Sequence, residues 1–203
     1  QQIPGVHTYN FNDLNSIKDI LRQLNNDVYA IFVEPYSCST LSESSEDFLK
    51  GLRTLCDELN ILLVFDEIYS GFAKCGPNFY MEKYGIIPDI VCLSKALGAA
   101  KSSISAYVVR DKIYKKAYGT LDGALLHSTT YNSFGEECVT AMEACRILKE
   151  EKLSEKSIAL EKIMKESLGT IAKKHPGLLE VRGAGTHFGL VFNPAIAKLQ
   201  PLL

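Results

Sequence analysis

The sequence lacks the segments that mark several classes of protein. Its apolar runs are far shorter than the ~20 residues that a helix needs to cross a bilayer, so we expect no membrane-spanning helix. Lysine and arginine number 22 against 24 for aspartate and glutamate, a net charge of -2, which predicts neither a nucleic-acid-binding surface nor a polybasic membrane anchor. Residues 1–5 show no cationic stretch before an apolar one, so we expect no secretory signal.

Cysteine pairs at metal-binding or redox spacing are also absent. None of the six cysteines forms a Cys-x-x-Cys pair, and several lie inside apolar runs. Six cysteines can form a disulfide framework in a secreted protein, and that alternative stays open, but such frameworks are typical of chains too short for a core. With 203 residues, 46% of them hydrophobic, this chain is long enough for one or two domains with a core. We therefore expect reduced thiols in a cytoplasmic protein.

Hydrophobic patterning predicts strands that alternate with helices through the first part of the chain. One helix is predicted over 14–24, capped by Asn12 or Asp13, and another over 48–59, capped by Ser44 or Ser45. Short, nearly unbroken apolar runs are typical of strands buried on both faces. The predicted strands are 28–33, 61–65, 90–93 and 104–109. This alternation predicts an α/β fold with a mostly parallel sheet and right-handed crossovers.

The pattern changes in the last third of the chain. Two helices are predicted near 134–150 and 155–174, followed by two short strands, 178–182 and 187–192. We therefore expect two parts. The first is a large α/β domain over residues 1–152, and the second is the start of a small α+β domain over residues 153–203.

An acid and an amine follow two of the predicted strands. Asp66 closes the apolar run 61–65, and Lys95 follows the run 90–94. Open α/β sheets bind ligands at the carboxyl edge of their strands. A carboxylate and an amine at neighbouring strand ends suit pyridoxal phosphate, because the amine can hold the aldehyde covalently while the carboxylate keeps the pyridine nitrogen protonated. Taken singly, such an acid also occurs in solvated loops or helix caps, and such a lysine is commonly surface charge.

The segment Phe65–Gly76 resembles the D-E-[VI]-x-[TS]-G-F-x-[RK]-x-G signature of class III aminotransferases, which are fold-type I pyridoxal phosphate enzymes. Other segments resemble further motifs of that family in the same order. They are Val33-Glu34-Pro35, Tyr84–Ile90, Ser94–Gly98, His127–Tyr131 and Val181–Gly185. Together these motifs cover residues 28–192, nearly the whole chain. The resemblance implies the large domain of that fold followed by the beginning of its small domain.

The resemblance also implies roles for five residues. Asp66 would pair with the pyridine nitrogen, and Lys95 would hold the cofactor and move a proton at the substrate carbon. Ile68 would pack on one face of the ring, while Tyr69 stands where many members carry a glutamine that touches the ring hydroxyl. Thr130 would hydrogen-bond the phosphate in a neighbouring subunit, which implies a homodimer. The implied substrates are an amino donor and a carbonyl acceptor.

Two departures from the family pattern bear on function. Tyr36-Ser37-Cys38-Ser39-Thr40 replaces the usual glycine-rich loop after Glu34-Pro35, and Lys101 adds a charge after the lysine motif.

Complete members of the family are about twice as long as this chain, so we interpret the chain as a central fragment. Three alternatives stay open. These are a non-catalytic partial domain, a related reaction (decarboxylase, lyase or aminomutase), and an unrelated binding module, against which the absence of a Gly-x-Gly-x-x-Gly loop argues.

Overall fold

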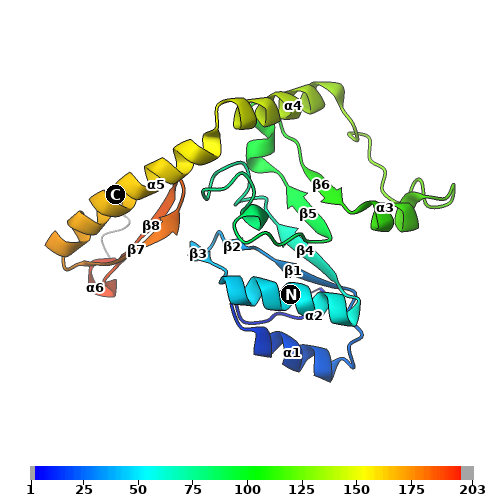
Figure 1. Ribbon diagram of the computed structural model, residues 1–203, viewed down its shortest axis with the longest axis horizontal. Coiled ribbons are helices and arrows are strands. Elements are labelled where there is room, and N and C mark those ends of the chain that lie inside the picture. Colours follow the sequence, from blue (N-terminus) through cyan, green and yellow to red (C-terminus); the bar gives the residue numbers. More distant parts are fainter. Residues whose placement is uncertain (1–2, 198–203) are drawn as a thin grey trace.

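The centre of the molecule is a four-stranded sheet, seen in a computed structural model that describes residues 3–197. The strand order is β1 (Ala30–Val33), β4 (Leu62–Asp66), β5 (Ile90–Leu93) and β6 (Ala106–Val109). The first three strands are parallel and β6 runs antiparallel to β5 (Figure 1). The prediction of an α/β fold with a mostly parallel sheet is confirmed. Residues 198–203 of the predicted small domain lie outside the described residues.

The direction of β6 follows from its connection to β5. The segment between them holds only a 3-10 turn, η2 (Lys95–Gly98), and two residues with left-handed backbone, Ala99 and Ala100. A parallel return to the same sheet usually requires a crossover helix, which this segment does not form. The chain therefore doubles back, and the strand predicted over 104–109 pairs from residue 106 onward as an antiparallel edge.

Two helices cover one face of the sheet. The helix α1 (Leu14–Gln23) begins at Asp13, whose carboxylate accepts from two backbone N–H groups, and α2 (Glu46–Leu59) begins at Ser45, whose hydroxyl accepts from Phe48 N. The predicted caps at Asp13 and Ser45 are thus confirmed. The core lies between these helices and the side chains of β1 and β4 that point toward them. It contains Ile31, Val33, Leu63 and Phe65 with Leu49 and Leu52.

The opposite face of the sheet is more open. Side chains alternate along a strand, so Phe32 and Asp66 point away from the face that holds Val33 and Phe65. Phe32 is 61% exposed. The strand pairing places Asp66 beside Cys92, and Cys92 beside Tyr107 of β6, on this same open face. Asp66 and Cys92 are half-buried here, and Val64, which points the same way, is buried, so this face is open only in part.

Several short elements were not predicted. A small hairpin of β2 (Tyr36–Ser37) and β3 (Ser42–Glu43) follows β1, a 3-10 turn η1 (Tyr80–Glu82) follows β4, and α3 (Asp111–Tyr118) follows β6. Each is too short to show a clear hydrophobic period. None alters the order of the central strands.

The last third of the chain forms two long helices and a hairpin. These are α4 (Gly135–Glu150), α5 (Leu153–Lys174), β7 (Leu178–Ala184) and β8 (His187–Phe192), with a final short α6 (Pro194–Ala197). Figure 1 shows α5 extending away from the central sheet with the β7–β8 hairpin beside it. Ala141 of α4 packs with Val91, Leu93 and Leu97. No helix in residues 3–197 has the length and apolar character of a membrane span.

Candidate active site

Asp66 and Lys95 lie at the same edge of the sheet. Asp66 is the last residue of β4 and pairs with Cys92 of the neighbouring parallel strand β5. Lys95 comes three residues after Cys92, where η2 begins. Its backbone has a φ of 46°, a left-handed conformation that costs a non-glycine residue on the order of 1 kcal/mol and that concentrates at functional sites. The exposed Lys95 thus leaves the sheet in a constrained turn.

Glu34 and Cys38 join this edge from β1. Val33 pairs with Phe65, so the next residue, Glu34, lies beside Asp66. The Glu34 carboxylate accepts a hydrogen bond from the backbone N–H of Cys38 at 2.7 Å. The pKa of the Cys38 thiol is raised, first by burial and next by Glu34, while the charge of Lys95 lowers it and that of Asp66 raises it. The charges of both predicted catalytic side chains therefore influence the pKa of this thiol, in opposite directions.

The Asp66 carboxylate is positioned by its own backbone. Its Oδ1 accepts from Ile68 N at 3.0 Å, which fixes the turn after β4. No other hydrogen bond to this half-buried carboxylate occurs within residues 3–197, so one carboxylate oxygen is open to a ligand.

The adjacent Glu67 has a structural role that the sequence did not reveal. It is 1% exposed and accepts hydrogen bonds from Tyr80 N (2.7 Å), Met81 N (2.8 Å) and the Ser70 hydroxyl (2.9 Å). Burial raises its pKa, and these three donors oppose that rise. Glu67 therefore connects the loop after β4, which begins beside Asp66, to η1.

Ile68 and Tyr69 extend the site in two directions. Ile68 lines a groove of about 1160 Å³ together with Cys92, Tyr107 and His127. The Tyr69 ring stacks near Tyr36 (6.4 Å between centroids), meets the edge of His187 (4.8 Å) and lies under Lys74 Nζ (4.3 Å). Burial, helped by nearby thiols and Glu34, raises the pKa of Tyr69 to about 12. Its hydroxyl stays protonated at neutral pH and is a hydrogen-bond donor.

Thr130 lies in a later segment of the chain. It is exposed in the segment between α3 and α4, and no hydrogen bond within the described chain joins it to Asp66 or Lys95. Nearby, Tyr107 Oη is 2.9 Å from Tyr118 Oη and 3.1 Å from His127 Nδ1. This polar network anchors the start of the Thr130 segment to β6. No sequence pattern predicted this network, because its contacts depend on how the chain folds back.

Comparison with known proteins identifies the family. The family model "Aminotransferase class-III" matches residues 5–201. The chain belongs to the class III aminotransferase family. The prediction made from the motifs is confirmed.

Individual relatives and structures agree with this assignment. This class III aminotransferase chain is 33% identical to an acetylornithine aminotransferase of Methanocaldococcus jannaschii, over 95% of the chain and 47% of the relative. It is 31% identical to a putrescine aminotransferase of Pectobacterium atrosepticum, over 90% of the chain and 40% of the relative. Its fold matches an ornithine aminotransferase of Toxoplasma gondii with a TM-score of 0.86 and 27% identity, over 95% of this chain and 44% of that one. The chain thus spans about half the length of these relatives.

The residues present in this class III chain fit the cofactor that the family uses. The half-buried carboxylate of Asp66 has one open oxygen, and the amine of Lys95 is exposed at the end of the adjacent strand. A small heterocycle with a basic ring nitrogen and an aldehyde requires one acid and one amine of this kind. The apolar Ile68, whose N–H donates to the Asp66 carboxylate, lines the adjoining groove and offers a face for a flat ring. The donor chemistry of the site is therefore suited to pyridoxal phosphate.

Proposed function

We propose that this chain is the central portion of a pyridoxal phosphate-dependent aminotransferase that moves an amino group between an amino donor and a carbonyl acceptor. The observation that carries the proposal is the placement of Asp66 and Lys95 on adjacent parallel strand ends in a class III chain. The relatives are aminotransferases named for putrescine, acetylornithine and ornithine, which supports a primary amine as donor.

The proposed roles follow from the chemistry of each side chain. When bound, pyridoxal phosphate supplies an electron sink for negative charge at the substrate carbon. Asp66 holds a proton on the ring nitrogen, which keeps that sink strong. Lys95 would hold the cofactor through Nζ and would carry the proton at the substrate carbon. Ile68 supports one face of the ring, and Tyr69 donates a hydrogen bond from its protonated hydroxyl.

The proposal extends to assembly and location. We infer a homodimer in which Thr130 serves the neighbouring subunit, because Thr130 is exposed and, within residues 3–197, forms no hydrogen bond to Asp66 or Lys95 of its own chain. We infer a division between a large domain, 1–152, and the start of a small domain, 153–203, at the left-handed Lys152 (φ 50°) between α4 and α5. The six free thiols support a reducing, cytoplasmic location.

A second candidate is a partial domain of the same fold without catalysis. The chain spans 40–49% of the length of three of these relatives, so cofactor binding by this segment has to be tested directly. Titration of the protein with pyridoxal phosphate separates the two. Saturable binding with a new absorbance band, lost in Lys95→Ala and kept in Lys101→Ala, supports the enzyme. Equal binding by both variants and the unchanged protein, or none by any, supports the partial domain.

A further inference from the structure

A pocket of about 410 Å³ lies where the start of α5 meets the loop after β4, and we call it the α5 pocket. Its walls also include the loop segment Phe72–Lys74, Ala96 of η2 and Thr186 of the β7–β8 turn. The residues of α5 that line it share one face of the helix and are Leu153, Lys156, Ser157 and Leu160. Most of this lining is apolar.

Backbone contacts fix the shape of the α5 pocket. Thr186 donates to the Lys74 carbonyl from its N–H at 2.9 Å and from its hydroxyl at 3.1 Å. Gly185 N donates to the Glu161 carboxylate of α5 at 2.7 Å. These bonds join the loop, the hairpin and the helix, so a ligand that enters has little ordering of the protein to offset.

Ser157 gives the α5 pocket a polar group without a partner. The residue is 4% exposed, and its Oγ has no hydrogen-bond partner among residues 3–197. A buried hydroxyl is normally hydrogen-bonded, because without a partner it loses its bonds to water and gains none in return. An acceptor atom that enters the pocket supplies the missing partner.

The start of α5 adds partial positive charge to the pocket. The helix has 22 residues, and no side chain caps its first turn, which follows the left-handed Lys152. The first N–H groups are therefore uncapped, and the aligned peptide dipoles favour an anion beside them. Glu155, the acidic residue of the first turn, pairs with Lys152 at 3.3 Å and does not line the pocket.

Lys74 is the cation of the α5 pocket whose charge is left uncompensated. Its Nζ lies 4.3 Å from the centroid of the neutral Tyr69 ring, and within the part of the chain that the structure describes it forms no salt bridge. Lys156 pairs with Glu151 at 3.0 Å on the surface. The charge of Lys74 therefore remains available to a ligand.

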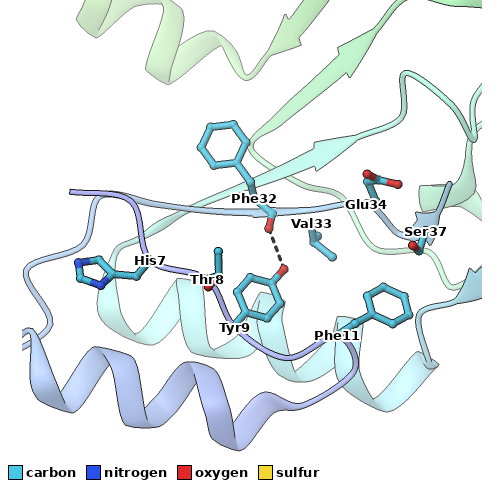
Figure 2. A pocket seen from close by; sticks show the side chains of 8 residues that line it. All are labelled: His7, Thr8, Tyr9, Phe11, Phe32, Val33, Glu34 and Ser37. Carbon is cyan, nitrogen blue, oxygen red and sulfur yellow. Dashed lines mark hydrogen bonds between the residues drawn. The ribbon is translucent and has the colours of Figure 1, made fainter. Parts of the chain in front are cut away.

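The pocket beside β1 that Figure 2 shows differs in this respect. Its Tyr9 hydroxyl donates to the Phe32 carbonyl at 2.7 Å. Its Glu34 carboxylate accepts from Cys38 N at 2.7 Å. Both groups have partners within the protein, so neither of them calls for a ligand as Ser157 does.

We propose that the α5 pocket binds a small organic carboxylate with an apolar body. The carboxylate accepts a hydrogen bond from Ser157 and meets the positive charge of Lys74 and of the helix end. The body packs on the apolar walls, which a purely inorganic anion leaves unfilled. The inference does not depend on the proposed function, although Ala96 of this pocket directly follows Lys95.

The test titrates the protein with 4-phenylbutanoate and with its neutral match, 4-phenylbutanamide, by isothermal calorimetry. We expect one saturable site for the carboxylate and about tenfold weaker binding of the amide. Ser157→Ala and Lys74→Met should each raise the Kd of the carboxylate about fivefold. Ser167→Ala and Lys162→Met change exposed residues of the same helix and should leave that Kd unaltered.

Lys95→Ala should bind the carboxylate as the unchanged protein does, which separates this pocket from the proposed cofactor site. Equal affinity for the carboxylate and the amide, tighter binding of inorganic phosphate, or no saturable binding would overturn the inference. An unaltered Kd in either Ser157→Ala or Lys74→Met, or loss of binding in Lys95→Ala, would overturn it as well. None of these results concerns the attachment of pyridoxal phosphate to Lys95, so the proposed function stands or fails separately.

Discussion

The effect of Lys95 on the electrostatics of the carboxyl edge of the sheet can be measured through the pKa of the Cys38 thiol. Lys95 favours the thiolate of Cys38, so its removal should raise the pKa of that thiol. The rise in Lys95→Ala should be small, because the interaction of one charge with the thiolate is weakened by water. The pH dependence of the alkylation rate measures it. Lys101→Ala is the matched control, and an equal rise in both variants would show that Lys95 has no special proximity.

At this residue scale, the sequence predicted the residues that follow strands but not those that depend on distant partners. Asp66 and Lys95 could be found because each directly follows an apolar run. The buried role of Glu67 could not, because its partners Tyr80 and Met81 come 13 and 14 residues later, from a turn that has no sequence period. The position of Glu34 beside Asp66 could not be predicted either, because it depends on the pairing of β1 with β4.

Asp89 links three elements of the fold. Its buried carboxylate, 6% exposed, accepts from Leu63 N of β4 at 2.9 Å and pairs with Arg53 of α2 at 2.9 Å and Arg110 at 3.3 Å. Burial opposes ionisation, but these donors lower its pKa. We expect Asp89→Asn to reduce the free energy of unfolding by about 3 kcal/mol at pH 7, measured by urea denaturation.

The effect of Asp89 depends on pH with a defined sign. A lowered pKa in the folded state gives stability that is present above the unfolded value of 3.8 and is lost as the pH falls through the folded value. The difference between Asp89→Asn and the unchanged protein should therefore shrink below about pH 4. Asp57 is the other acidic partner of Arg53, and its side chain is 66% exposed. Asp57→Asn should therefore reduce the free energy of unfolding by less than about 1 kcal/mol. A pH-independent difference for Asp89→Asn would contradict this assignment.

At the element scale, the type and order of the long elements could be predicted, but strand direction could not. Continuous apolar runs identified β1, β4 and β5, and capping residues placed the starts of α1 and α2. The β6 strand has the same kind of apolar run, and its antiparallel direction depends on the turn at Ala99 and Ala100, where alanine gives no sign of a left-handed backbone.

The junction between the β7–β8 hairpin and the rest of the molecule rests on close backbone contact. Gly185 has a φ of 59°, and a Cβ there would lie 2.4 Å from Lys74 O and 2.5 Å from Gly76 N. Thr186 N donates to the same Lys74 carbonyl at 2.9 Å. We expect Gly185→Val to detach the hairpin and to speed hydrogen exchange across β7 and β8 at least tenfold, with β1 and β4 unchanged.

Gly169 provides the control for this change. It lies in α5 with no atom within 4 Å of an added Cβ, so Gly169→Ala should leave exchange in the hairpin unaltered and slightly stabilise the helix. Unchanged exchange in Gly185→Val would show that the hairpin is not held by this contact. The sequence predicted a glycine turn here but not its partner, Lys74, which lies more than 100 residues earlier.

At the scale of the whole molecule, the proposed function requires a cofactor held between Asp66 and Lys95. The most direct measurement is borohydride reduction of the protein after incubation with pyridoxal phosphate, followed by peptide mapping. The account predicts one modified peptide, with the cofactor fixed to Lys95 Nζ, and a reduced yield in Asp66→Asn. Modification spread over other lysines, or concentrated on any lysine except Lys95, would contradict it.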